Sequence, residues 1–586
     1  MCRALLINLL AVSAHSNARC GEDAFRLSDV QGKGNNSPLV GQKVTVEGII
    51  TLDSRNLGGW RGFYLQQADT EIDNDPDTSE ALFIYTNRKA GNMGDRIRVT
   101  GRVKEYHGLT ELTQVSGLKV CGREKLPRAI PVSLPWPADR APENLENMLV
   151  RFVKPLSIIG AYSFARYGEI TLASEPQVTP TQVMPPGPKA LAMAEQQSLH
   201  RLFLDDGKSI RDPRPLPWPS QPLMEGKPVR AGDRLNGLTG ILDFRFGHWR
   251  LQSTEKPRLT EPSQRPSAPV RSPRTTLRLV TYNLHNFFNG DGRGTGFGQS
   301  RGARNPSQLN LQTSRLIATL KAINPDIIAA VEMENDDYGS HSAIAHLANA
   351  LGPEWRFVKT PGVTGTDAIR TDLLYRHDRV ETLGQPLRFA GEASEEQGRP
   401  SLAQVFRPTG GQQQASVRVL VSHFKSKACG GATGADRDQK DGQGCYARRR
   451  TESAQALADW LASLPAPRDP GHPFAGTLVT GDLNSYAREW PIQRLEEAGL
   501  TNLIRSRYPC TLARCPQTSY RFQGRKGSLD YSLGSAPLLD YIVDAGVWPI
   551  NAEEFPVVGY QGPLAAPDGT PWRSSDHNPL YTDLSL

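Results

Sequence analysis

The stretch Thr477-Leu-Val-Thr-Gly481-Asp482-Leu-Asn484 predicts the architecture of the C-terminal half of the chain. Its first five residues are typical of a buried strand, and two polar side chains follow directly. Similar strands alternate with stretches of helical periodicity elsewhere in this half, which predicts an α/β layered domain. The predicted strands are Leu277–Tyr282, Asp326–Val331, Val417–Ser422 and Thr477–Gly481, and the predicted helices are Leu309–Ile323, Ser342–Leu351 and Arg448–Leu464.

The N-terminal half has a different pattern, with short alternating or β-branched runs bounded by glycine. Such runs predict a small OB-like barrel, a five-stranded closed sheet of a kind that often binds single-stranded nucleic acid. The segment from Gly232 repeats the pattern of the segment from Gly94, so we expect a second OB-like module. The runs of the first module are Val40–Ile50, Gly62–Gln66, Ala81–Tyr85 and Gly94–Val103.

A proline- and serine-rich stretch between the two halves predicts an extended linker. We expect a chain that starts near Arg271 to contain the whole C-terminal site. The predicted segments are a signal peptide at 1–18, an OB-like barrel at 20–125, a second β-rich domain at 126–259, the linker at 260–276 and the α/β domain at 277–586.

The N-terminus has one early positive charge, an apolar run and then small residues, which predicts a short export signal. Its removal would also remove Cys2 and leave six cysteines, an even number that suits an oxidised secreted protein. A zinc site is the alternative, but the chain has no Cys-x2-Cys pair. The predicted bridges are Cys20–Cys121, Cys429–Cys445 and Cys510–Cys515.

We therefore expect a secreted protein, and its periplasmic retention or association with the outer surface stays open. No later stretch of about 18 apolar residues is found, so no membrane insertion is expected. The net charge of +7 and the pI near 8.9 suit a polyanionic partner without requiring one.

Polar side chains follow the predicted strands of the C-terminal half, where a rigid sheet can hold them in place. Each of them alone is also typical of a turn, a helix cap or a structural histidine. The ordered set is harder to explain by chance. It comprises Asn283, Glu332, His423, Asp482, Asn484, Asp530, Asp576 and His577.

In this set and order the C-terminal half resembles the endonuclease/exonuclease/phosphatase superfamily, the fold of pancreatic deoxyribonuclease, over about Leu277 to Leu584. The stretches Ser422–Asp436 and Asp441–Tyr446 are similar to the extracellular bacterial nuclease branch of the ExeM and NucH type. The resemblance implies an α/β (α+β) four-layer sandwich, two sheets face to face with helices outside, preceded by the OB-like barrels. The matching strings begin at Thr281, Val331, Ser422, Gly481, Leu529 and Ser575.

The residue types suit phosphodiester hydrolysis, because the transition state adds negative charge to the phosphorus oxygens. Glu332, Asp576 and Asn283 can supply oxygen ligands to Mg²⁺ or Mn²⁺, which offsets that charge. Asp482 beside Asn484 is suited to activating the attacking water. His423 and His577 are the donors that can meet the developing charge.

The resemblance also implies that Asp530 orients His577, and whether Asp482 or the Asp530–His577 pair activates water stays open. Asp540-Tyr looks locally like Asp530-Tyr, but we prefer Asp530 because a buried strand is predicted after Asp540. One position departs from pancreatic deoxyribonuclease. In pancreatic deoxyribonuclease a glutamate pairs with the equivalent of His423. Ile369 stands at that position here, and we expect Asp367 to take the role of the glutamate.

Basic side chains surround this acidic set, and their alternative role is a solvated surface. Lys425, Arg370 and Arg437 are the predicted phosphate contacts, and Lys427, Lys440 and Arg448–Arg450 lie close in sequence. An acidic loop, Asp69–Asp77, lacks the glycine and terminal glutamate of an EF-hand. We interpret it as solvated, with a structural Ca²⁺ as the alternative.

These features predict a secreted, metal-dependent endonuclease that cleaves DNA, with RNA as an alternative substrate, and we expect a monomer. Two other functions stay open. One is a small-substrate phosphoesterase of the same superfamily, although no exposed apolar hairpin for a lipid surface is seen. The other is a non-catalytic protein that binds extracellular DNA.

Overall fold

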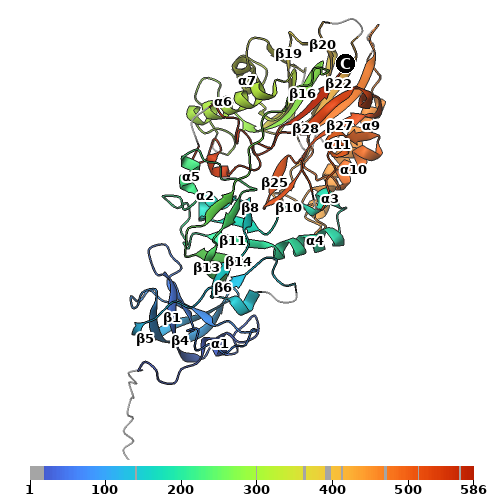
Figure 1. The fold of residues 1–586 in the computed structure, drawn as a ribbon. Coiled ribbons are helices and arrows are strands. Elements are labelled where there is room, and N and C mark those ends of the chain that lie inside the picture. Colours follow the sequence, from blue (N-terminus) through green and yellow to red (C-terminus); the bar gives the residue numbers. More distant parts are fainter. Residues whose placement is uncertain are drawn as a thin grey trace, which may run out of the picture. The chain divides into compact units, whose positions relative to one another are not determined.

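The computed structural model describes residues 19–138, 142–298, 300–360, 364–389, 398–410, 414–467, 471–512, 514–565 and 569–586. The predicted export signal at 1–18 lies outside these residues. The chain divides into two compact units, which are coloured along the sequence in Figure 1. Unit 1 comprises Met1–Val153, Phe203–Ile210 and Gly237–Pro257, and unit 2 comprises Lys154–Leu202, Arg211–Asn236 and Arg258–Leu586.

Unit 1 begins with a closed barrel of five strands in the order β1-β2-β3-β5-β4. Its interior is apolar, and the short helix α1 (Leu27–Gln31) adds Leu27 and Val30 to that core. The predicted strands Gly62–Gln66 and Ala81–Tyr85 are confirmed to the residue. The strands are β1 (Lys43–Ser54), β2 (Gly62–Gln66), β3 (Ala81–Tyr85), β4 (Asp95–Tyr106) and β5 (Leu109–Arg123).

Five further strands complete unit 1, and two of them explain the repeat seen in the sequence. The β13–β14 hairpin and the β4–β5 hairpin each turn through two residues with positive φ, Phe246–Gly247 and His107–Gly108. Paired positive φ values match the twist of the flanking strands. The strands are β6 (Ile130–Val132), β7 (Leu149–Phe152), β11 (Arg201–Asp205), β13 (Thr239–Arg245) and β14 (His248–Ser253).

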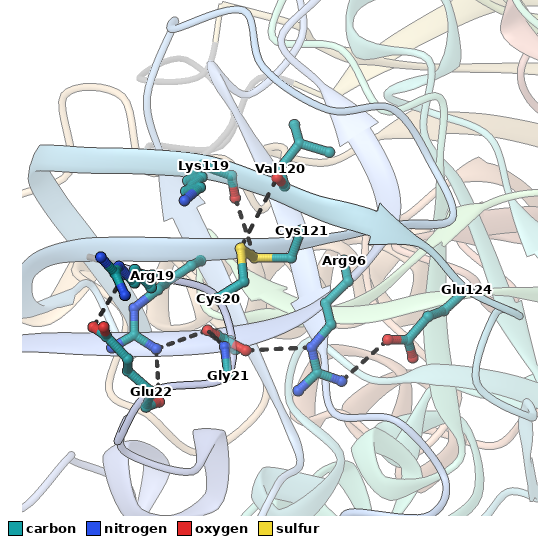
Figure 2. Close-up of a disulfide and its surroundings, with 11 residues drawn as sticks. Arg19, Cys20, Gly21, Glu22, Arg96, Lys119, Val120, Cys121 and Glu124 are labelled. Carbon is teal, nitrogen blue, oxygen red and sulfur yellow. Dashed lines mark hydrogen bonds and ion pairs between the residues drawn. A yellow bond between two sulfur atoms is a disulfide. The ribbon is translucent and has the colours of Figure 1, made fainter. Parts of the chain in front are cut away.

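All three predicted disulfides are present. Figure 2 shows the bridge from Cys20 to Cys121, on the last part of β5, with Arg96 and Glu124 paired nearby. It closes a separation of 101 residues, so it restricts the unfolded chain more than the other two bridges do. Those two, Cys429–Cys445 and Cys510–Cys515, close separations of 16 and 5 residues in unit 2.

Unit 2 contains a mixed α/β sandwich, as predicted. One sheet has the order β18-β19-β17-β16-β29-β28 and the other β20-β21-β22-β23-β27-β24. An apolar core lies between the sheets, and two more lie under the helices α6 and α7 on one side and α9 and α10 on the other (Figure 1).

The elements of this sandwich follow the alternation read from the sequence, with ends within a few residues of the predicted ones. The helices are α6 (Pro306–Ile323), α7 (Ala343–Leu351), α9 (Ala447–Ser463), α10 (Trp490–Glu497) and α11 (Leu503–Arg507). The strands are β16 (Leu277–Phe287), β17 (Ile327–Glu334), β18 (Trp355–Phe357), β19 (Ile369–Arg376), β20 (Val380–Phe389), β21 (Ser401–Pro408), β22 (Ser416–His423), β23 (Phe474–Asp482), β24 (Leu500–Asn502), β27 (Asp530–Ser535), β28 (Ile542–Val547) and β29 (Leu580–Leu584).

Part of the predicted second β-rich domain also belongs to unit 2. Here β10 (Gln177–Val178) pairs with β26 (Arg525–Gly527), which in turn pairs with β25 (Tyr520–Phe522). The remaining elements are β8 (Leu156–Gly160), β9 (Ile170–Ala173), β12 (Arg234–Asn236), β15 (Arg258–Glu261), α2 (Phe164–Tyr167), α3 (Pro180–Val183), α4 (Pro188–Leu199) and α5 (Ser220–Met224).

The predicted linker is fixed along unit 2 and is not a free spacer. Arg265 pairs with Glu554 at 2.6 Å, and Arg271 pairs with Asp326 at the same distance. Pro266 O accepts a hydrogen bond from Trp548 Nε1. Ion pairs at both ends therefore hold this stretch against the sandwich.

Among the described helices, none has the length and apolar character needed to cross a membrane.

Candidate active site

The strand register brings the predicted polar side chains together. His423 ends β22 and pairs with Asp482 at the end of β23, and Asp482 pairs with Asp530, which begins β27. In the facing sheet, Asn283 lies on β16 and Glu332 on β17. Asn283 Nδ2 donates to Glu332 Oε1 at 3.1 Å and to Asp482 Oδ2 at 3.2 Å, so the two sheets meet at these residues.

His577 forms a buried ion pair with Asp530. His577 Nδ1 lies 2.7 Å from Asp530 Oδ2, and His577 Nε2 lies 3.9 Å from Asp482 Oδ2. Burial alone would lower the pKa of His577, but the charges of Asp530, Asp576 and Asp482 raise it well above 6.5. The raised pKa favours the imidazolium form of His577, and Nε2 of this ring is directed toward Asp482 at the centre of the site.

Asp482 occupies that centre. Burial, the charge of Asp530 and, more weakly, the charge of Glu332 raise its pKa to about 7, although His577 opposes them. The backbone N–H of Asn484 donates to Asp482 Oδ1 at 2.9 Å and holds the carboxylate in place. A carboxylate with such a pKa can accept a proton near neutral pH.

On the other side of Asp482, His423 contacts an arginine that sequence reasoning missed. Arg399 Nη1 lies 2.9 Å from His423 Nε2. Burial and the charges of Arg399, His577 and Arg301 hold the pKa of His423 well below 6.5. Because a guanidinium only donates, His423 is neutral, accepts at Nε2 and carries its proton on Nδ1.

Asp367, the predicted partner of His423, is linked to it through that arginine. Asp367 Oδ2 lies 3.4 Å from Arg399 Nε, and Asp367 Oδ1 lies 3.3 Å from Arg301 Nη1. The arrangement is therefore a chain from carboxylate to guanidinium to imidazole. In the sequence Arg399 is a single arginine before Pro400, just ahead of strand β21, and no motif marks it.

The donor set fits a divalent cation. Ligand atoms of Glu332, His423 and Asp482 converge within 4.8 Å, as do those of Asp482, Asp530 and His577. The predicted ligand Asp576 lies beside His285, 4.0 Å away. Its pKa is about 2, because His285, His577 and Arg573 together outweigh the effect of burial. Hard oxygen donors with this much negative charge suit Mg²⁺ or Mn²⁺.

Within the described ranges the acidic loop 69–77 is not among the groups of converging metal ligands. One of its carboxylates, Asp75, pairs instead with Lys33 at 2.6 Å. A calcium ion there stays a prediction.

Backbone strain gathers at the same place. Glu332 has a φ of 62°, and His285, Asn286 and Asn484 have φ values of 55°, 55° and 47°. Residues other than glycine rarely adopt this left-handed region, which costs about 1–2 kcal/mol each. At Glu332 the strain is accompanied by a bond from Asn286 N to Oε2 at 2.8 Å. Such strain typically gathers where side-chain placement serves function.

The predicted phosphate contacts fall into three situations. Lys425 is half-buried above the Tyr446 ring, and burial and Arg399 lower its pKa. Arg437 is exposed on the loop closed by the Cys429–Cys445 bridge. Arg370 is wrong as a phosphate contact. It is 0% exposed and pairs with Asp372 at 2.8 Å, so it is a structural ion pair under β19.

The basic stretch after Tyr446 is largely structural. Arg450 is fully buried and donates to Cys445 O at 2.7 Å. Arg449 pairs with Asp436 at 3.1 Å, and Arg448 pairs with Glu452 at 2.7 Å. These contacts favour the structural role over a phosphate site for at least Arg450.

Helix α3, far away in the sequence, ties three of the site's loops together. Gln182 Oε1 accepts from Ser528 N at 3.0 Å, before Asp530, and from Ala487 N at 3.4 Å, after Asn484. Thr181 Oγ1 donates to Glu489 Oε1 at 2.8 Å, and Glu489 pairs with Lys427 at 2.6 Å, on the loop after His423. Sequence reasoning placed α3 in another domain and gave it no role.

Comparison with known families matches residues 280–577 to the Endonuclease/Exonuclease/phosphatase family. A search of curated proteins gives no match. Solved structures with some similarity include a humanized D. rerio TDP2 (16% identity, TM-score 0.34, 53% of this chain and 99% of that one) and the human Nocturnin catalytic domain (15%, 0.33, 53% and 94%). A mannosyl-6-phosphatase of Bacteroides thetaiotaomicron is another (14%, 0.33, 53% and 100%).

The matched range contains the whole row of His423, Asp482 and Asp530 together with Asn283, Glu332 and His577. It covers just over half of the chain. The chain therefore belongs to the endonuclease/exonuclease/phosphatase family, whose members hydrolyse phosphoester bonds.

Proposed function

We propose that the protein is a secreted, metal-dependent endonuclease that hydrolyses phosphodiester bonds of DNA, with RNA as an alternative substrate. The observation that carries the proposal is the space around Asp482. A protonated His577 lies on one side, and a neutral His423 bonded to Arg399 lies on the other. Such a space offers both a proton acceptor and donors to a phosphate group.

In the proposed mechanism, Glu332 and Asp576, together with Asn283, would hold Mg²⁺ or Mn²⁺, and the cation would offset the charge that develops on the phosphate. Asp482, steadied by Asn484 N, accepts the proton of the attacking water. His577, already protonated and oriented by Asp530, donates to the leaving oxygen. The reverse assignment, with the Asp530–His577 pair as base, requires a neutral His577.

The choice of a polyanionic substrate rests on the basic side chains near His423. Burial, and after it the charges of Arg399, Arg449 and Arg301, lower the pKa of Lys425, which indicates that these cations lie close to one another. The charge of Asp367 opposes them. Crowded cations suit successive phosphates of a nucleic acid better than a single small phosphoester.

Cleavage of plasmid DNA, with and without chelator, tests the function. We expect nicked and linear products that disappear with chelator and return with added Mg²⁺ or Mn²⁺. Asp530→Asn should abolish them, and Asp540→Asn is the matched control, because Asp540 also precedes a tyrosine but is exposed. Binding without cleavage would point to the non-catalytic alternative. Cleavage confined to small sugar or lipid phosphates would point to the phosphoesterase alternative.

Export, the OB-like nature of the barrel and the monomeric state are parts of the same proposal. The three bridges support an oxidising compartment, since disulfides persist there. Alkylation of the denatured, unreduced mature protein should label no cysteine, and its N-terminus should lie near residue 19. Stoichiometric labelling would contradict export.

A further inference from the structure

The β25–β26 hairpin lies directly beside the Asp530–His577 pair. The Tyr520 ring lies 4.5 Å from the His577 ring, and the Ser519 hydroxyl accepts from Asp530 N at 3.1 Å. The hairpin begins one residue after Ser519 and ends three residues before Asp530. Both of its ends are therefore anchored at the site.

Three half-buried cations lie on this hairpin, and neutral groups fix two of them. Arg525 Nε donates to Gln197 Oε1 at 2.5 Å, and its Nη2 donates to Ala194 O at 3.1 Å. Arg521 Nη1 donates to Ile159 O and Gly524 O, both at 3.3 Å. These bonds orient the guanidinium groups without neutralising their charge.

The charges act on one another. Burial and the charge of Arg521 lower the pKa of Lys526, although Glu553 opposes them. Burial and Arg525 lower the pKa of Arg201, at the start of β11, to about 10. Glu553 is the carboxylate that faces Arg521, at 4.0 Å. Like charges held this close favour an anionic ligand.

We propose that this hairpin, with Arg521, Arg525 and Lys526, binds the sugar–phosphate backbone of the nucleic acid beyond the scissile bond. Lys526 lies four residues before Asp530, so the chain between them spans at most about 13–14 Å. That is about four nucleotides at 3.4 Å each. Phe522, 55% exposed beside the turn, offers a ring on which a base can stack.

This inference rests on the proposed function and specifies its substrate as a strand several nucleotides long. A small phosphoester bound at the site would not extend to Arg525 and Lys526 on the second strand of the hairpin. The hairpin therefore distinguishes the two enzymatic functions that the sequence left open.

The test compares the full-length wild type with the double variant Arg525→Gln/Lys526→Gln. The control variant Lys321→Gln/Arg494→Gln removes two charges from the outer helices α6 and α10. The readouts are kcat and KM on long DNA and on bis(p-nitrophenyl) phosphate over a series of salt concentrations. Circular dichroism confirms folding, and Lys526→Gln alone replaces the double variant if that variant does not fold.

We expect KM on DNA to rise in the hairpin variant, because two cations that bind phosphate are gone. Its dependence on log salt should fall by about 0.9 for each phosphate group that the variant no longer neutralises. The ratio of kcat/KM on DNA to kcat/KM on the small diester should fall as well. Equal decreases on both substrates, or an unchanged salt slope, would overturn the proposal.

If the wild type cleaves only the small diester and not DNA, that result contradicts the proposed function and leaves the hairpin proposal to a separate test. The hairpin is then tested alone, by fluorescence anisotropy of a labelled oligonucleotide. Equal binding by the wild type and the hairpin variant in that assay overturns the hairpin as a nucleic-acid site.

Discussion

Each unit of the molecule buries a cluster of acidic side chains, and the two clusters behave differently. In unit 1, Glu146 is fully buried and accepts from Thr110 N at 3.1 Å and from Gln31 Nε2 at 3.3 Å. Burial, then the charges of Glu143 and Glu105, raise its pKa well above 4.5. The raised pKa values of Glu146 and Glu143 thus favour the protonated, uncharged form of these side chains.

In unit 2, cationic side chains lower the pKa of a buried acid, Asp576. The raised pKa of His577 favours its imidazolium form, and Asp576 has a pKa of about 2 although it is buried as well. Asp482 approaches the behaviour of Glu146, with a pKa of about 7. The comparison teaches that burial alone neutralises carboxylates, whereas placed histidines and arginines keep a buried site charged and ready for a cation.

The largest expected difference between the clusters is in catalysis. Asp530→Asn leaves His577 without the carboxylate that orients it, so kcat should fall on the order of 10⁴-fold. Glu146→Gln replaces a neutral acid by a neutral amide of the same shape, so kcat should not change. Steady-state kinetics on DNA measure both. Equal effects of the two substitutions would break the comparison.

A smaller decrease is expected when the support of the charged cluster is removed. Gln182→Ala leaves the loops before Asp530 and after Asn484 without their shared acceptor, and a shift of about 1 Å can cost about 10²-fold in kcat. Gln182→Glu keeps an oxygen acceptor and should restore activity with KM near the wild-type value.

The same interaction revises an expectation from the sequence. A chain that starts at Arg271 lacks helix α3, and we now expect it to be inactive. An active truncation would show that α3 is dispensable.

Metal binding should stabilise unit 2 and leave the stability of unit 1 unchanged. Mg²⁺ at ten times its dissociation constant should stabilise unit 2 by about 1.4 kcal/mol. Hydrogen exchange should therefore slow for β17 and β23, while the barrel strands of unit 1 exchange at an unchanged rate. Equal slowing in both units would mean that the ion binds elsewhere.

The smallest expected effect is the pH dependence of unit 1. The folded-state pKa of Glu146 lies above 4.5 and that of Glu143 is about 7, so the folded unit binds more protons than the unfolded chain. The stabilisation is complete below pH 4.5 and is lost as pH rises through 7 and beyond. The protection factors of the barrel amides, which are corrected for the intrinsic exchange rate at each pH, should fall from pH 5 to 8, and Glu146→Gln should reduce that fall. A pH-independent wild type would contradict this assignment.

Much of the sandwich was predictable, because its strands and helices have clear apolar periodicity. Polar residues that follow the predicted strands in the sequence also lie side by side in the register of the sheet. The β23 strand and its polar end, Asp482, are one example, and the pairing of Asp482 with Asp530 follows once the strands are neighbours. The hairpin of β20 and β21 was missed. The edge strand β20 is largely exposed and has no continuous apolar run, and the buried strand β21 has Ser401, Gln404 and Arg407 among its apolar residues.

The site residues that directly follow strands were predictable from the sequence. The residues that reach the site through contacts between distant parts of the chain were not. Arg399 was overlooked because a single arginine before a proline has no signature by itself. Arg370 was assigned to substrate because sequence does not report that Asp372, two residues along the same strand face, would pair with it. Gln182 lies 346 residues before Ser528, and only the fold brings them together.

The left-handed backbone of Glu332 has an evolutionary consequence. At a φ of 62°, the backbone conformation has a lower energy for glycine or asparagine than for glutamate. A gene copy released from selection for hydrolysis would therefore gain stability by replacing Glu332, and would drift toward an inactive but sturdier protein.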